Sequence, residues 1–176
     1  MTWNDELLEQ LTWHWEHQLR PRLDGLTDAE YLWEPVRPSW NVHPRPDGPP
    51  TIDFEYPEPV PTPVTTIAWQ FGHLLVGILG ARSATYFDGP PVDYFSYDYP
   101  TTAADALARL DEAYTVWVAG VRSLGEDGLT RLCREEEFEQ STMAALVLHI
   151  HREVIHHGSV VSTLRDLYAW RDRLGR

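Results

Sequence analysis

Lysine is absent from this 176-residue sequence: its fourteen basic residues are all arginines, set against twenty-seven acidic ones. The formal net charge of −13 argues against nucleic-acid binding, because phosphate backbones require a basic surface. We interpret this charge as a contribution to solubility. Cysteine is nearly absent too. Cys133 is the only one, which excludes an internal disulfide and a zinc site built from several cysteines.

Long hydrophobic runs are also missing. The longest, such as residues 74–79, fall far short of the roughly 20 residues that cross a bilayer, so we expect no membrane-spanning helix. The N-terminus has Asp5 and Glu6 where a secretion signal needs a basic end and an apolar stretch, which predicts a cytoplasmic protein. The hydrophobic content of 43% is typical of a globular protein, and we expect residues 1–176 to form one domain.

Four segments have helical periodicity, with apolar residues recurring every three or four positions. The predicted helices cover about residues 5–23, 65–87, 102–124 and 141–172. Pro21 is expected to interrupt the first of them near its end. Capping patterns predict a short helical turn at residues 27–33 and mark the start of the third helix at Thr102. Four amphipathic helices of this length predict an all-α fold, a four-helix bundle.

A proline-rich segment, residues 34–63, separates the first two predicted helices and also contains Trp40, Phe54 and Tyr56. A loop this long inside a compact domain is usually functional or disordered, and its aromatic residues favour an ordered loop folded over one end of the helices. Its acidic part, residues 47–58, contains no arginine and would bind an anionic cofactor poorly. The connection at residues 125–140 is acidic as well, and we expect a short strand or turn within it.

Residues 149–158 carry the strongest chemical signal, with four histidines and one glutamate. Residues four apart share one face of a helix, so His149, Glu153 and His157 form a single stripe. The stripe continues toward apolar Val161, which predicts that it points inward. A carboxylate in such a line costs several kcal/mol unless it is paired or bound to a metal ion.

Helix geometry limits this stripe to two metal ligands. Residues four apart are separated by about 6 Å along the axis, so Glu153 and His157 can share one ion, whereas His149 lies about 12 Å from His157. A third ligand must come from another helix, and His73 is the best candidate because its neighbours are expected to face the core. Two histidines and one carboxylate leave coordination positions open, which is typical of a catalytic site.

Each residue also has an interpretation without metal. His73 alone could be a hydrogen-bonded core histidine, and Glu153 could pair with an arginine such as Arg82. His151 and His156 could be surface residues. The metal interpretation depends on the coincidence of the three ligands.

Other candidates rank lower. His149 and His156 are expected to be supporting or alternative ligands, while His14 and His17 compete from a more polar part of the first helix. Cys133 is a weak candidate nucleophile, because the acidic residues that follow it raise the pKa of a thiol.

At these residues the sequence resembles the DinB-like superfamily of four-helix metal-binding proteins. The similarity is closest to the branch with mycothiol-dependent maleylpyruvate isomerases and related thiol transferases. It rests on Trp69-x-x-x-His73 and Glu153-x-x-x-His157, and on segments 23–30 and 164–168. Many family members have a second histidine in place of Glu153, whereas glutamate is found in the maleylpyruvate isomerase branch.

The resemblance implies an enzyme that uses a divalent metal and a low-molecular-weight thiol, mycothiol in an actinobacterium, against a small electrophile. Zinc is the expected ion, with nickel, iron or manganese as alternatives. Two other interpretations stay open: a metal-dependent hydrolase that activates water, and a non-catalytic bundle whose metal only holds the helices together. Many bundles of this kind are dimers, so a homodimer is a further expectation from the resemblance.

Overall fold

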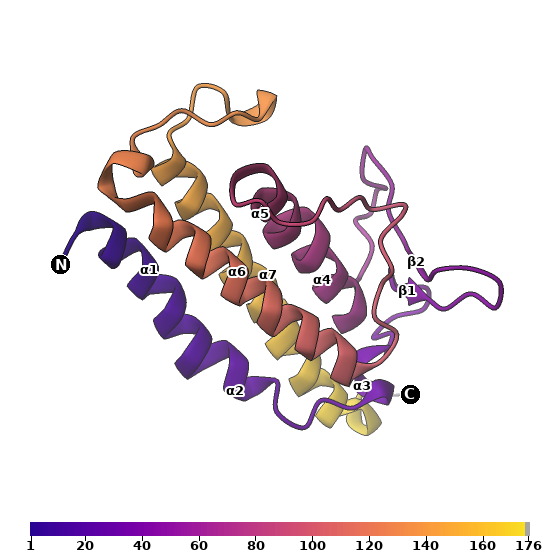
Figure 1. The fold of residues 1–176 in the computed structure, drawn as a ribbon. Helices are drawn as coiled ribbons and strands as arrows, with labels where there is room; N and C mark the ends of the chain where they lie inside the picture. The colour runs from indigo at the N-terminus through magenta and orange to yellow at the C-terminus, as the bar shows by residue number, and fades with distance from the viewer. Residues whose placement is uncertain (175–176) are drawn as a thin grey trace.

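The structure of the chain, a computed structural model, describes residues 1–174, apart from the side chain of Glu137. It is mostly helical, as the all-α prediction requires. All four predicted helical segments are found, each within a few residues of its expected bounds (Figure 1). They are α1 (Trp3–His14) continued by α2 (Arg20–Arg22), α4 (Ile67–His73) continued by α5 (Ala81–Tyr86), α6 (Ala103–Leu129), and α7 (Met143–Ala169).

Threonine side chains begin these helices. Each accepts a hydrogen bond from the backbone amide three residues further on, and the caps are Thr2, Thr66, Thr102 and Thr142. Thr27 caps the short α3 (Asp28–Tyr31) in the same way, where a turn was predicted. Glu30 does not complete a capping box there, because its carboxylate accepts a hydrogen bond from Arg165 at 2.7 Å.

Two helices pass through a π-helical stretch without a break. One stretch, Trp15–Leu19, joins α1 to α2, and the other, Leu74–Gly80, joins α4 to α5. Pro21 was expected to interrupt the first helix, but α2 carries the helix on to Arg22. Wider turns of this kind are frequent at functional sites. The second stretch begins directly after His73.

The helices share one hydrophobic core. In Figure 1, α6 runs between α1 and the helix formed by α4 and α5, with α7 behind it. The largest fully buried side chains come from several elements and include Trp117, Tyr31, Tyr99 and Phe71. Because α4 and α7 pack against each other, His73 is brought next to the helix that carries Glu153 and His157.

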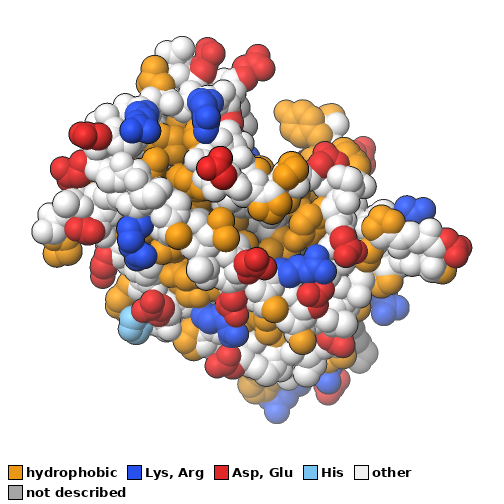
Figure 2. All heavy atoms as spheres, viewed as in Figure 1, with side chains coloured by type: hydrophobic (Ala, Val, Ile, Leu, Met, Phe, Trp, Pro, Cys, Tyr) orange, Lys and Arg blue, Asp and Glu red, His pale blue; other side chains and the backbone are white. Residues whose placement is uncertain are grey.

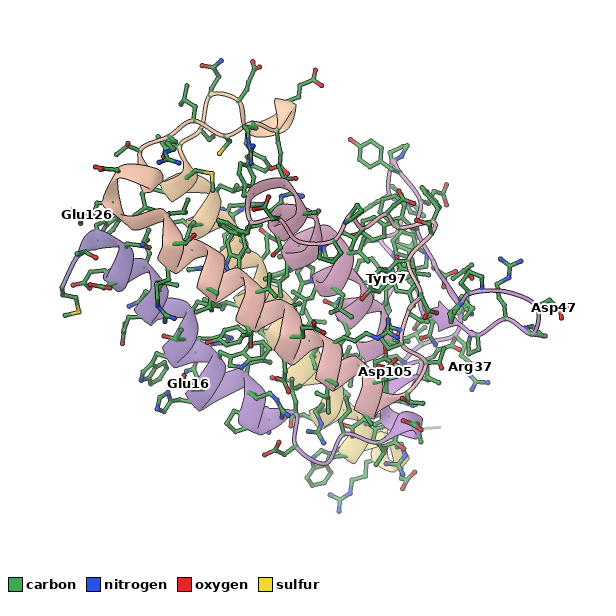
Figure 3. The ribbon with its side chains drawn as sticks, in the orientation of Figure 1. Glu16, Arg37, Asp47, Tyr97, Asp105 and Glu126 are labelled. Atoms are coloured by element: carbon green, nitrogen blue, oxygen red, sulfur yellow. The ribbon has the colours of Figure 1, made fainter. Side chains whose placement is uncertain are left out.

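The proline-rich segment contains a hairpin that was not predicted. Strands β1 (Val42–His43) and β2 (Thr51–Ile52) pair in antiparallel fashion, and Figure 3 shows Asp47 at the tip of their connecting loop, pointing away from the helices. The base of the segment is fastened to α4, since the indole Nε1–H of Trp69 donates to the Asp53 carbonyl at 2.7 Å. This fastening keeps the segment beside His73.

The connection between α6 and α7 contains little regular secondary structure. Gly125, at φ 57°, breaks α6 close to the predicted end of that helix. A 3₁₀ turn (Glu136–Phe138) and a single bridge between Leu132 and Thr142 follow. Cys133 is buried here, and burial, aided by the charge of Glu135, raises the pKa of its thiol. No helix within residues 1–174 is both long and apolar enough to span a membrane.

Candidate metal centre

His73 and His157 face each other between α4 and α7. Their ring centroids are 4.5 Å apart in an edge-to-face arrangement. Glu153 lies one turn before His157, and its Oε2 is 3.7 Å from Nε2 of that histidine. The structure therefore places both His73 and Glu153 beside His157.

The orientation of His157 is fixed by Gln70. The Nδ1 of His157 lies 2.7 Å from Oε1 of Gln70, and the Gln70 amide nitrogen donates to the Thr65 hydroxyl at 2.7 Å. An amide oxygen only accepts hydrogen bonds, so Nδ1 of His157 carries the proton and Nε2 presents a lone pair. That lone pair faces Glu153. Metal-binding histidines are commonly held in this way, with the other ring nitrogen donating to an acceptor.

His73 is held in a comparable manner. Its Nδ1 lies 2.5 Å from the hydroxyl of Tyr94, and its ring stacks on Trp69 with an interplanar angle of 10°. Burial lowers the pKa of His73 to about 4, and the charge of His157 adds to this effect while Glu153 opposes it. Burial likewise lowers the pKa of His157 to about 4. Both rings are neutral at pH 7, which is the form that binds metal ions.

The interpretation without metal predicted that Glu153 pairs with Arg82, but the two side chains are not paired. Its Oε1 instead accepts hydrogen bonds from Arg152 at 3.1 and 3.2 Å. Arg82 pairs with Glu135, with 3.4 Å between the two charged groups. The Glu153 side chain is 21% exposed, so it lies at the edge of the buried face. The stripe points fully inward only at His157, because the buried line of α7 runs beside it, through Ile150, Val154 and Val161.

The other candidate histidines lie in four different surroundings. The Nδ1 of His149 lies 3.6 Å from Oε1 of Glu153, whereas His157 faces Oε2 of the same carboxylate. His149 therefore neighbours Glu153 but not His157. His156 is exposed, and its ring lies edge-to-face against that of His157, with the centroids 5.1 Å apart. The prediction that His151 is a surface residue was wrong. Its side chain is only 4% exposed and packs edge-to-face with Trp117. His14 and His17 make hydrogen bonds within the first helix.

Within residues 1–174, no three His, Cys, Asp or Glu side chains already form a cluster that could hold a metal ion. The donor atoms of His157 and Glu153 nevertheless fit a metal ion. Nε2 and Oε2 are both electron-rich, and they face each other at 3.7 Å with no proton on the histidine nitrogen to join them. Two donors on one zinc, at about 2.0–2.2 Å each, lie at most about 4 Å apart. The observed separation is therefore compatible with a shared ion.

Replacing Gln70 with leucine should destabilise the metal-free protein by about 1–3 kcal/mol, because the buried Nδ1–H of His157 loses its acceptor. Urea unfolding would measure the loss. Gln18→Leu is the matched control, since Gln18 pairs with His14 in a comparable contact on the exposed face of the first helix. Equal effects of the two substitutions would contradict a specific role for Gln70.

A cavity of about 340 Å³ opens beside His157. Helices α4 and α7 form one wall, through Trp69, Gln70 and Val160, and the proline-rich segment forms the other, through Trp40 and Pro63. Its size suits a small ligand. A second cavity of about 300 Å³ lies on the face shown in Figure 2, where hydrophobic side chains surround a hollow beside α5. None of the three predicted ligands lines this second cavity.

Gln70 and Tyr94 were not predicted as parts of the site. Gln70 offered a signal, because a glutamine between Trp69 and Phe71 on an apolar helix face needs a hydrogen-bond partner. Tyr94 offered none, since it comes from the irregular segment between α5 and α6.

Comparison with known proteins identifies the family. The sequence profile of the DinB superfamily matches residues 10–161, a range that includes His73, Glu153 and His157 and most of the helices that hold them. No curated protein and no solved structure matches the chain. Because the profile covers most of the sequence, the chain belongs to the DinB superfamily.

Proposed function

We propose that this chain binds a divalent metal ion through His73, Glu153 and His157, and that it uses the ion in a thiol transfer or isomerisation on a small electrophile. The observation that carries the proposal is the arrangement of His157, whose proton is fixed toward Gln70 while its bare Nε2 faces the Glu153 carboxylate. Two acceptors so placed in a largely buried site are best explained by a cation between them.

A divalent ion would supply a positive charge that lowers the pKa of a thiol or of water. Two imidazoles and one carboxylate suit zinc, with nickel, iron and manganese as alternatives. Three protein ligands would leave room for a substrate group. Gln70 and Trp69 contribute by holding the two histidine rings in place.

The cavity beside His157 supports a particular kind of thiol. Its described lining includes the Trp40 and Trp69 rings and the carboxylate-bearing Glu58, and no arginine. Such a lining favours an uncharged ligand over an anionic one, because a carboxylate near Glu58 would be repelled. We therefore propose a neutral thiol such as mycothiol in preference to the anionic glutathione or bacillithiol.

The test is a transfer assay on zinc-loaded protein with monochlorobimane as the electrophile. We expect turnover that requires both metal and thiol, with mycothiol faster than glutathione at equal concentration. Glu153→Gln, which keeps the size of the side chain but removes its charge, should lose the activity. An exposed-site variant, Glu16→Gln, serves as its matched control.

Each alternative has its own result in this assay. Turnover of an ester or amide substrate that ignores the thiol would refute the transferase and favour a metal-dependent hydrolase. A melting temperature that rises with zinc, without turnover of any substrate, would refute catalysis and favour a metal that only joins the helices.

We also propose that residues 1–176 form one four-helix-bundle domain that acts in the cytoplasm, as a homodimer, without binding nucleic acid. Support for the single domain is the shared core of α1, α4, α6 and α7. The acidic composition supports the absence of a nucleic-acid partner.

A further inference from the structure

Tyr94 occupies a position that its irregular segment alone does not explain. Its hydroxyl lies 2.5 Å from Nδ1 of His73, although the two residues belong to different elements. Three contacts hold it there: its ring stacks on Phe54 at 4.8 Å, Phe54 also meets Phe95, and the Tyr99 hydroxyl donates to the Tyr94 carbonyl at 2.9 Å. Burial raises the pKa of Tyr94, so its phenol stays protonated at neutral pH.

Gly77 provides the space for this hydroxyl. A Cβ at Gly77 would lie 2.1 Å from Oη of Tyr94, 3.1 Å from its Cζ and 3.2 Å from Cε1 of His73. The backbone of Gly77 is in an ordinary helical conformation, so glycine is required here for room and not for its dihedral angles. Gly77 lies in the π-helical stretch that follows His73, on the side that Tyr94 approaches.

We propose that Tyr94 is a positioning residue for His73. When Nε2 of His73 binds an ion, Nδ1 keeps the proton of the neutral ring and donates it in a hydrogen bond to Oη of Tyr94. The tyrosine thus does for His73 what Gln70 does for His157, and both rings are held at Nδ1. The inference rests on the proposed metal site for its consequence, but the hydrogen bond itself can be tested without metal.

Tyr94→Phe removes the hydroxyl and keeps the ring that stacks on Phe54. We expect Co²⁺ affinity, measured by competition with a chelator, to fall about 10- to 100-fold, and the visible absorption bands of bound Co²⁺ to shift. Tyr97→Phe is the matched control, because Tyr97 lies in the same segment but lines the second cavity (Figure 3). Unchanged affinity and spectrum in Tyr94→Phe would overturn the inference.

Gly77→Ala tests the same contact from the helix side. Its methyl group would displace the hydroxyl, so we expect it to weaken Co²⁺ binding by a similar factor. Combined with Tyr94→Phe it should weaken binding by less than the product of the two single factors, because the oxygen that the methyl group meets most closely is already gone. Fully additive losses would show that the two substitutions act separately, against the proposal.

A second readout does not depend on metal. In metal-free protein with ¹⁵N-labelled histidine, the Nδ1 resonance of His73 should move in Tyr94→Phe and stay in place in Tyr97→Phe. A His73 signal unaffected by Tyr94→Phe would overturn the positioning role whatever the metal does. Conversely, wild-type protein that binds no metal, yet shows the Tyr94-dependent signal, would refute the proposed function and leave the contact standing.

Discussion

Protein carrying Glu153→Ala is expected to lose its metal ion. The carboxylate is the only anionic donor at the meeting point of α4 and α7 among the predicted ligands, and without it two neutral imidazoles remain to hold a dication. Supporting residues around metal ligands already cost about 10- to 100-fold in affinity when changed, so loss of a ligand should exceed 100-fold. His73→Ala and His157→Ala should have comparable effects.

Metal analysis after dialysis, followed by calorimetric titration with Zn²⁺, measures the loss. Glu16→Ala is a suitable control, since Glu16 is exposed in the π-helical stretch between α1 and α2, and Figure 3 shows it away from α4. The wild type and the control should retain about one equivalent of metal. Unchanged metal content in Glu153→Ala would remove Glu153 from the site and with it the main support for the proposed function.

Acid should destabilise the metal-free protein well before its carboxylates are protonated. His73, His151 and His157 all have a pKa of about 4 in the folded state because burial disfavours their charged forms. In the unfolded chain a histidine titrates near 6.5, so as pH falls below 6.5 the unfolded state takes up protons that the folded state refuses. Stability is therefore full above pH 6.5 and declines as pH falls toward 4.

His151 isolates one part of this effect. Its ring is buried against Trp117, beside a backbone group of Leu7. Between pH 7.5 and 5 it should account for roughly 2 kcal/mol of lost stability. Urea unfolding of His151→Leu at both pH values should show a correspondingly smaller decline, while exposed His17→Leu should decline like the wild type. An identical decline in all three proteins would contradict the buried neutral His151.

Helices and their starting points could be predicted from the sequence because their causes are local. Thr102 and Thr27 begin helices where the capping patterns placed them, and Gly125 breaks α6 where its amphipathic pattern ended. The meeting of His73 with His157 was also predictable. His73 was expected among core-facing residues and His157 at an inward position of its helix. Side chains that point into one small core from two helices lie close together.

The parts that could not be predicted depend on contacts between distant segments. Whether His151 or His149 faces the core is decided by the direction from which α1 and α6 approach α7, which no pattern on α7 reveals. Tyr94 reaches His73 only because two irregular segments meet through Phe54. The hairpin at residues 42–52 forms from two-residue strands, too short to produce an alternating pattern.

The π-helical stretch that joins α4 to α5 has the effect of one residue inserted into an otherwise continuous helix. Each residue of an α-helix turns the chain by about 100°, so everything after the stretch is out of phase with the helix before it. Arg82 lies beyond this phase change, and its charge nevertheless acts on both His73 and Tyr94. His73 and Gly77 are four residues apart and would share a face of any α-helix, whereas Arg82, nine residues after His73, would lie about 180° away on a regular one. The insertion thus turns Arg82 back toward the side of the helix that carries His73 and Gly77.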